Sequence, residues 1–311
     1  MTHFIKIWLV CIFCVPWICF GQEVEQHVIT STDGTLLKAL LLHPNAIPST
    51  TPRPVIVALH GCGGLYATTG INQGKLNARH AGMAQLITAN GYSILFPDSF
   101  SSRGESSLCS QKFSSRKIKQ SHRSDDVDGA LLWLETQPWA DTSKIALLGW
   151  SHGGSTALRS IDANRQKVAS RKLQPSTAIT FYPGCSDALK NNFRPQIPLV
   201  MMLAELDDWT APGPCIQLAK NVGASFFVYP DSYHGFDNPV GKVRLRTDVP
   251  NGVNPGKGGS HWSQSHYRST SLESIAAYFA YAMGIVTTLK ICMSCNTTLD
   301  DHKAPQAQSP H

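Results

Sequence analysis

The segment LLGWSHGGST, residues 147–156, joins an apolar run to a stretch with helical spacing, and a serine stands at the junction. The run 144–150 predicts a buried strand, and Gly149 and Gly153 flank Ser151 two positions before and two positions after it. In a tight turn from strand to helix, side chains at those two positions would collide, so glycine fits both. The turn leaves the serine exposed at the carboxyl end of its strand, where open parallel sheets place their chemistry.

Outward from this turn, strand-like and helical segments alternate along the chain. The segment 25–44 predicts two strands around a turn at Asp33–Gly34. Further strands are expected at 54–60, 92–98, 144–150, 176–183, 198–206 and 225–230, and helices at 76–91, 124–137 and 270–283. This alternation predicts an α/β fold with a mostly parallel central sheet flanked by helices, in one domain over residues 22–285.

Three other segments are not expected to add helices or strands to that domain. The basic run RKIKQSHR, residues 116–123, is expected to form a solvated loop before a helix. Residues 241–265, rich in glycine, proline and asparagine, predict a long loop. Periodicity is lost after residue 285, so residues 286–311 are expected to form a disordered tail.

The first 21 residues resemble an export signal, with Lys6 before an apolar run over 7–20 and the small residue Gly21 for cleavage. An uncleaved N-terminal anchor is the alternative, although the run is short for a membrane span and Pro16 interrupts it. The protein is therefore expected to be periplasmic or extracellular and free of the membrane after cleavage. The formal net charge of +6 comes without a basic block interleaved with aromatic residues, so no nucleic-acid partner is expected.

The cysteines outside the signal are even in number, which suggests disulfides in an oxidising compartment but leaves several pairings open. They are Cys62, Cys109, Cys185, Cys215, Cys292 and Cys295. Cys292 and Cys295 lie in the polar tail, where they either pair locally or stay free. No histidine and cysteine cluster has the spacing of a zinc site, so no metal is expected.

A serine hydroxyl becomes a nucleophile only when a base takes its proton and an acid orients that base. In a fold with this strand-to-helix turn, the chain order is serine, acid, histidine. After Ser151 the sequence offers Asp207 and Asp208 past one strand and His234 past the next. Neighbouring side chains in an extended turn point apart, so only one aspartate can face His234. The AELD turn favours Asp207, and Asp208 is expected to cap the next turn or to face water.

A glycine-rich loop, LHGCGG at residues 59–64, follows the strand at 54–60. Loops of this type supply one backbone N–H of an oxyanion hole, and the residue after the nucleophile supplies the other. The donors expected here are the backbone N–H groups of Cys62 and His152.

At these residues the chain resembles a known family. HGCGG, LFPDSFSSRGESSLC, GWSHGG, FYPGC, AELDDWTAPGPC and YHGFD are together similar to the dienelactone hydrolase family of the α/β-hydrolase fold, over about residues 24–284. The similarity is greater still to the exported, cysteine-containing branch of that family. It implies a hydrolase of small-molecule esters or lactones that forms an acyl-enzyme and uses no cofactor.

The resemblance also carries expectations for individual residues. Founding members of the family use a cysteine nucleophile, so Ser151 favours a serine carboxylesterase over a hydrolase of dienelactone itself. Arg103, in DSFSSRG, matches the arginine that binds the substrate carboxylate in the family, or else it is a solvent-facing loop residue. The implied disulfides are Cys62–Cys109 and Cys185–Cys215. A peptidase of the same fold and a binding protein without catalysis remain as alternatives, and the ester groups and the oligomeric state stay open.

Overall fold

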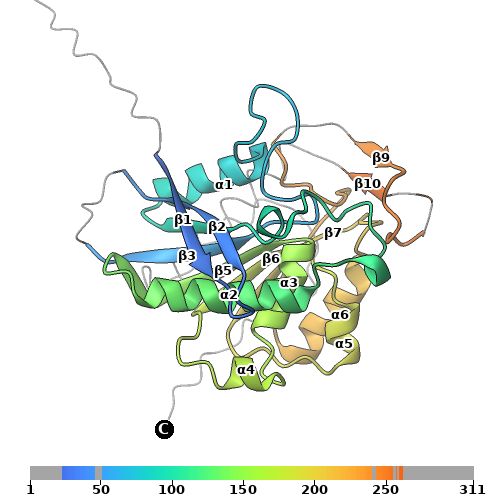
Figure 1. The fold of residues 1–311 in the computed structure, drawn as a ribbon. Coiled ribbons are helices and arrows are strands. Elements are labelled where there is room, and N and C mark those ends of the chain that lie inside the picture. The colour runs from blue at the N-terminus through green and yellow to red at the C-terminus, as the bar shows by residue number, and fades with distance from the viewer. Residues whose placement is uncertain (1–22, 46–50, 240–242, 255–256, 258, 262–311) are drawn as a thin grey trace, which may run out of the picture.

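An eight-stranded sheet forms the centre of the molecule, in the order β1-β2-β4-β3-β5-β6-β7-β8 (Figure 1). The structure is a computed structural model that describes residues 23–45, 51–239, 243–254, 257 and 259–261. The strands are β1 (Val24–Thr30), β2 (Leu36–Leu42), β3 (Arg53–Leu59), β4 (Ser93–Pro97), β5 (Ala140–Trp150), β6 (Thr177–Phe181), β7 (Leu199–Ala204) and β8 (Ser225–Tyr229). β2 runs antiparallel to both β1 and β4, and every pairing from β4 through β8 is parallel. This is the arrangement of the α/β-hydrolase fold.

Helices cover both faces of this sheet, and each face buries its own apolar cluster. Helix α1 (Ala78–Ala89) packs on one face through Met83, Ala84 and Ile87. On the other face lie α2 (Gln120–Glu135), α3 (His152–Ser160) and α6 (Pro212–Val222), as Figure 1 shows. Shorter helices are α4 (Gln166–Ala169) and α5 (Ser186–Lys190), with 3-10 turns η1 (Ser101–Arg103) and η2 (Phe113–Ser115).

The burial of the strands follows from the two covered faces. Every residue of β4, β6 and β7 is buried, as expected for strands with helices on both sides. β1 instead is largely exposed, with Val28 65% exposed, because it lies at the edge of the sheet. Because β3 and β5 through β8 run parallel, their carboxyl ends meet along one edge of the sheet, where the loops that follow them come together.

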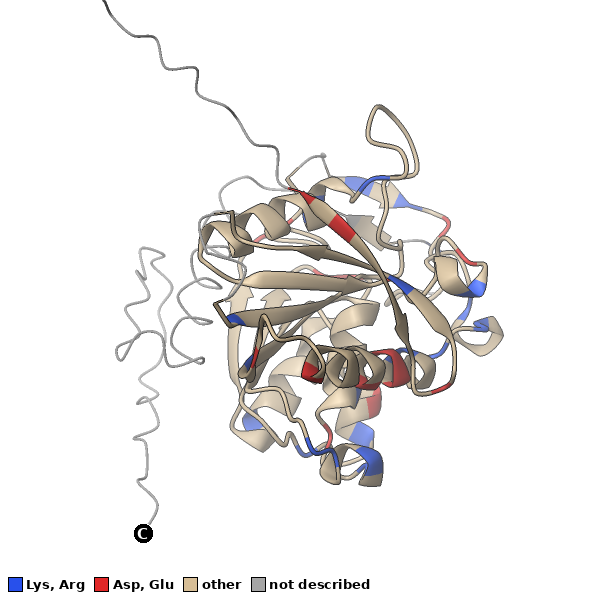
Figure 2. Ribbon diagram, turned by 60° about the vertical axis from the view of Figure 1, so that its left-hand side comes forward, with Lys and Arg blue, Asp and Glu red and all other residues tan. Residues whose placement is uncertain are grey.

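Charged side chains of both signs are spread over the fold. In Figure 2, acidic residues lie on α2 and basic residues lie on segments near it. Lys167 on α4 pairs with Asp125 and Asp128 of α2, and Arg171 also pairs with Asp128. These ion pairs join α4 to α2 across the surface of the domain.

The predicted strands and the first two helices are confirmed, with shifts at their ends. Two expectations are wrong. In the basic run 116–123, Arg116 and Arg123 are buried, and α2 already begins at Gln120. The expected long loop at 241–265 contains a hairpin of β9 (Arg244–Arg246) and β10 (Gly259–His261).

The predicted signal at 1–21, the helix at 270–283, the tail at 286–311 and the cysteines Cys292 and Cys295 lie outside the described residues. Within the described part of the chain, no helix has both the length and the apolar character needed to span a bilayer.

Candidate active site

Ser151 stands on a strained turn between β5 and α3, as the glycine spacing predicts. Its φ is +51°, a conformation that costs energy for any residue with a side chain. A Cβ atom on Gly149 would lie 2.5 Å from the carbonyl oxygen of Gly153, and one on Gly153 would lie 1.9 Å from that of Leu59. Both positions therefore exclude any larger residue, and the turn presents the serine hydroxyl at the carboxyl edge of the sheet.

His234 and Asp207 complete a hydrogen-bonded chain that ends on this hydroxyl. The His234 Nε2 atom lies 2.9 Å from the Ser151 Oγ atom, and its Nδ1 atom lies 2.8 Å from Asp207 Oδ2. Asp207 follows the end of β7 and His234 follows the end of β8, so neighbouring parallel strands bring the two together. An ionised carboxylate at Nδ1 favours a proton on that nitrogen, which leaves Nε2 to accept the proton of the serine.

The Asp207 carboxylate has a second task, which corrects an expectation from the sequence. Its Oδ1 atom accepts hydrogen bonds from the backbone N–H groups of Trp209 and Thr210, both at 2.9 Å. Thus Asp207 itself caps the turn after β7. Asp208 points elsewhere and accepts a hydrogen bond from the Ser260 N–H at 2.6 Å.

Aromatic rings enclose the His234 imidazole on two sides. The Trp209 ring stacks on it at a centroid distance of 4.7 Å, and the Tyr182 ring lies at 4.5 Å with a tilt of 56°. His234 and Asp207 are 3% and 4% exposed. Water is thereby kept away from the bond between them, and the imidazole is held in one orientation.

The loop after β3 packs directly against the Ser151 turn. A Cβ atom on Gly61 would lie 3.6 Å from the Ser151 Cβ atom, so the backbone before Cys62 runs beside the nucleophile. The Cys62 carbonyl accepts hydrogen bonds from Leu108 N at 2.8 Å and from Ser107 Oγ at 3.2 Å. This loop is therefore fixed where the sequence places one oxyanion donor, and His152, at the start of α3, stands where it places the other.

Both disulfides implied by the resemblance are present, and they lie beside these loops. Cys62–Cys109 and Cys185–Cys215 have Cα–Cα distances of 4.9 Å and 5.0 Å. The first attaches the loop after β3 to the segment after β4, and the second attaches the segment after β6 to α6.

Arg123, expected from the sequence to lie in a solvated loop, is instead a buried cation on α2 beneath the site. Its side chain is fully buried, and it donates hydrogen bonds to His152 Nδ1 and to the His60 carbonyl, both at 2.8 Å. Burial lowers the pKa of Arg123 to about 10, which leaves it charged at neutral pH. Only its place on the inner side of α2 distinguishes it from the exposed basic residues beside it, and that place depends on tertiary packing.

Arg103 does not reach the site, contrary to the role suggested for it. Its guanidinium donates to both carboxylate oxygens of Asp126, at 2.7 and 3.0 Å, and to Asp33 at 2.8 Å. These two carboxylates, together with the Ser99 carbonyl, occupy the donors of both terminal nitrogens of Arg103. Arg103 therefore joins η1 to α2 and to the turn between β1 and β2.

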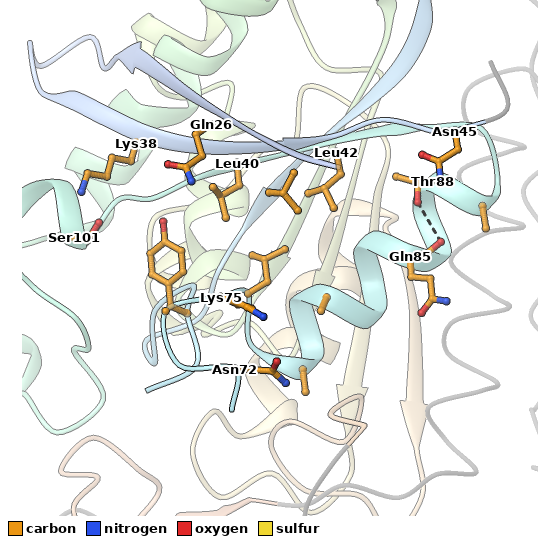
Figure 3. A pocket seen from close by; sticks show the side chains of 17 residues that line it. Gln26, Lys38, Leu40, Leu42, Asn45, Asn72, Lys75, Gln85, Thr88 and Ser101 are labelled. Carbon is orange, nitrogen blue, oxygen red and sulfur yellow. Dashed lines mark hydrogen bonds between the residues drawn. The ribbon is translucent and has the colours of Figure 1, made fainter. Parts of the chain in front are cut away.

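A cavity of about 830 Å³ opens beside the nucleophile. Its walls include Ser151, His152 and Trp209, with the basic residues Arg116 and Arg159. A larger cavity of about 1180 Å³ lies between β1, β2 and α1, where Figure 3 shows Leu40, Leu42 and Lys75 among the side chains around it. Since Ser151 lines only the smaller of the two, that cavity is the candidate substrate site. Across the described residues, no group of three or more His, Cys, Asp or Glu side chains is arranged to hold a metal ion.

Comparisons with known proteins bear on the family and the fold of this chain. The model of the dienelactone hydrolase family matches residues 37–264. Among curated proteins none matches the chain.

Solved structures with the same fold include esterase 2 of Thermogutta terrifontis phosphorylated by paraoxon, with 15% identity, a TM-score of 0.59, and coverage of 85% of this chain and 96% of that one. Puromycin hydrolase has 14% identity and a TM-score of 0.57, with coverage of 85% of this chain and 40% of that one. Dipeptidyl peptidase 4 of Porphyromonas gingivalis has 16% identity and a TM-score of 0.51, with coverage of 68% and 32%. At such identities the likeness shows the fold.

Proposed function

Since the chain belongs to the dienelactone hydrolase family, we propose that it is a serine hydrolase that cleaves small carboxylic esters or lactones through an acyl-enzyme. The observation that carries the proposal is the hydrogen-bonded chain from Asp207 through His234 to the Ser151 hydroxyl, with distances of 2.8 and 2.9 Å. Such a chain converts a weak hydroxyl nucleophile into an activated one. Ser151 lines a cavity of about 830 Å³, a size that suits a small-molecule substrate.

In the first half of the reaction, His234 Nε2 accepts the hydroxyl proton while Ser151 Oγ attacks the carbonyl carbon of the ester. The carbonyl oxygen becomes an oxyanion, which accepts hydrogen bonds from the backbone N–H groups of Cys62 and His152. When this intermediate collapses, the bond to the alcohol oxygen breaks and His234 gives the proton to the departing alcohol. The acyl group is left as an ester of Ser151.

In the second half, water takes the place of the alcohol. His234 accepts a proton from the water as its oxygen attacks the acyl carbon, and a second tetrahedral intermediate forms at the same donors. Its collapse returns the proton to Ser151 and releases the carboxylic acid. Throughout, Asp207 keeps the imidazole oriented and stabilises its positive charge.

The proposal includes export and one catalytic domain. Two disulfides support an oxidising compartment, because such bonds are rare where thiols are kept reduced. We therefore retain residues 1–21 as a signal peptide, residues 22–285 as the domain and residues 286–311 as a tail.

The test compares hydrolysis of p-nitrophenyl butyrate with hydrolysis of the matching p-nitroanilide, for the wild type and for Ser151→Ala. We expect turnover of the ester, and a loss of about 10⁶-fold in kcat when the hydroxyl is removed, as for serine nucleophiles in other triads. Ser170→Ala, which changes an exposed serine at the end of α4, is the matched control and should keep full activity. Preference for the anilide would favour a peptidase, and no turnover of either would favour a binding protein.

A further inference from the structure

His152 places a side chain as well as a backbone N–H next to the nucleophile. It is the first residue of α3, directly after Ser151. His152 lines the 830 Å³ cavity, yet the residue is only 7% exposed. What this ring offers to a substrate depends on which of its two nitrogens carries the proton and which already has a protein partner.

The Nδ1 atom of His152 is already occupied. Arg123 Nη1 lies 2.8 Å from it, and a guanidinium can only donate hydrogen bonds. Nδ1 is therefore the acceptor, and the proton of the neutral ring is on Nε2. Among the described residues none forms a hydrogen bond with that Nε2–H, so a residue that lines the cavity carries a donor without a protein partner.

The ring is held neutral and in one orientation. Burial, followed by the charges of Arg123 and Arg116, lowers the pKa of His152 well below its usual value. Arg123 is itself fixed, because its second nitrogen donates to the His60 carbonyl at 2.8 Å and its guanidinium lies 5.1 Å from the centre of the Phe100 ring. The Nε2–H thus has a set direction before any substrate binds, and such preorganised donors contribute most to selectivity.

We propose that His152 is a substrate-positioning residue, whose Nε2–H donates a hydrogen bond to a second oxygen of the substrate close to the scissile ester. The ligand class is an ester or lactone with an ether, hydroxyl or carbonyl oxygen a few bonds from the reacting carbonyl. Arg123 is the residue that orients this donor. The inference rests on the proposed esterase function, because it concerns the same cavity.

The test uses two pairs of substrates that differ by one atom. On the acyl side, p-nitrophenyl methoxyacetate replaces one methylene of p-nitrophenyl butyrate by oxygen. On the alcohol side, 2-methoxyethyl butyrate replaces one methylene of butyl butyrate in the same way. Each ratio of kcat/KM is divided by the ratio of the two alkaline hydrolysis rates, which removes the intrinsic effect of the oxygen.

For the wild type we expect a corrected preference of about tenfold for the oxygen-containing member of at least one pair, as one good hydrogen bond supplies. In His152→Leu this preference should disappear. In His152→Gln it should largely return, since the amide can accept from Arg123 and donate toward the cavity. The absence of a preference in both pairs, or a preference that His152→Leu leaves unchanged, would overturn the proposal.

Two further measurements cover a leucine variant that does not fold and a failure of the proposed esterase function. If the leucine variant does not fold, ¹⁵N NMR of the histidine-labelled wild type decides: a protonated Nε2 on His152 supports the inference and a protonated Nδ1 overturns it. Failure of the proposed function gives a different result, because then neither member of either pair is hydrolysed by a process that Ser151→Ala abolishes.

Discussion

Two histidines belong to the site around Ser151, and the charges of their partners give them opposite properties. His234 bonds the Ser151 hydroxyl, and His152 follows Ser151 in the chain and lines the same cavity. His234 has the Asp207 carboxylate at its Nδ1, 2.8 Å away, whereas His152 has the Arg123 guanidinium at its Nδ1, also 2.8 Å away. An anion at Nδ1 draws the proton there and leaves Nε2 as an acceptor. A cation at Nδ1 excludes that proton and makes Nε2–H a donor. The same side chain is thus suited to act as a base at position 234 and as a hydrogen-bond donor at position 152.

For each histidine, a charged neighbour at Nδ1 decides which ring nitrogen carries the proton. Both partners are buried, and both are held by further hydrogen bonds: Asp207 by the turn after β7, Arg123 by the His60 carbonyl. The fold therefore fixes the two tautomers before substrate binds. Substitutions of the partners test this account more sharply than substitutions of the histidines themselves.

The largest effect is expected from Asp207→Asn, which removes the anion from the His234 side. Without the carboxylate, the imidazole can take the wrong tautomer and its positive charge is no longer stabilised, so kcat should fall by about 10⁴-fold. Asp208→Asn is the matched control, because within the described part of the chain that carboxylate bonds the Ser260 N–H and not His234. Steady-state rates with p-nitrophenyl butyrate measure both variants. A loss in Asp208→Asn with Asp207→Asn unimpaired would assign the wrong carboxylate.

A smaller effect, on the free energy of unfolding alone, is expected from Arg103→Gln. Arg103 bonds Asp126, which lies on α2, the helix that also carries Arg123. Asp126 is fully buried on α2 and would lose the two hydrogen bonds from Arg103, which in comparable buried pairs costs about 3–5 kcal/mol. Since Arg103 does not line the cavity, KM should stay unchanged at temperatures where the variant is folded. Urea unfolding and ester kinetics test the two statements.

Lys172→Gln is the control for this prediction. Lys172 pairs with Glu135 at 3.2 Å but its side chain is 90% exposed, so its loss should change stability little. A raised KM in Arg103→Gln with unchanged stability would restore the substrate-binding role for that arginine.

The smallest effect expected is a fall in the free energy of unfolding at acidic pH, caused by a histidine that stays neutral when buried. His80 is buried, and burial together with the Arg79 charge lowers its pKa to about 3. In the unfolded chain a histidine takes up a proton near pH 6.5, so between about 6.5 and 3 the unfolded state binds more protons. The contribution of neutral His80 to the free energy of unfolding is therefore fully present above about pH 6.5. It falls as the pH is lowered from about 6.5 to 3, by up to about 1.4 kcal/mol per pH unit.

Urea unfolding of the wild type and of His80→Gln at pH 7.0 and pH 5.5 isolates this contribution. The wild type should lose more stability between the two values than the variant does. Equal losses would mean that His80 binds a proton in the folded protein, and the neutrality assigned to buried His152 on the same grounds would need to be measured directly.

The sequence predicts the pair of His234 and Asp207 well and the pair of His152 and Arg123 poorly. Glycines around Ser151, and the order of Ser151, Asp207 and His234 after successive strands, are local patterns with a geometric cause, and the structure brings these residues together. Arg123 lies in a basic run, RKIKQSHR, in which buried and exposed cations look alike. Whether a charge on a helix faces the core depends on what packs against it, and no periodicity within that run shows this.

The same reason explains the error at Arg103 and the omission at Asp207. A motif can indicate that an arginine stands in the loop after β4, but its direction follows from two carboxylates that are distant in the sequence, Asp33 and Asp126. The turn after β7 suggested a capping role for Asp208, and the structure gives it to Asp207 because one oxygen can cap while the other faces His234. Residue roles of this kind become visible only with the fold.

The activation of the Ser151 hydroxyl by His234 and Asp207 is tested most directly by the rate at which a fluorophosphonate modifies Ser151. The reaction is followed by intact mass and peptide mapping. This reagent reacts with the activated hydroxyl itself and requires no knowledge of the natural substrate. We expect a single adduct on Ser151, formed at similar rates in the wild type and in Asp208→Asn and at least about 10³-fold more slowly in Asp207→Asn. An adduct on another residue, or equal rates in all three proteins, would contradict this activation.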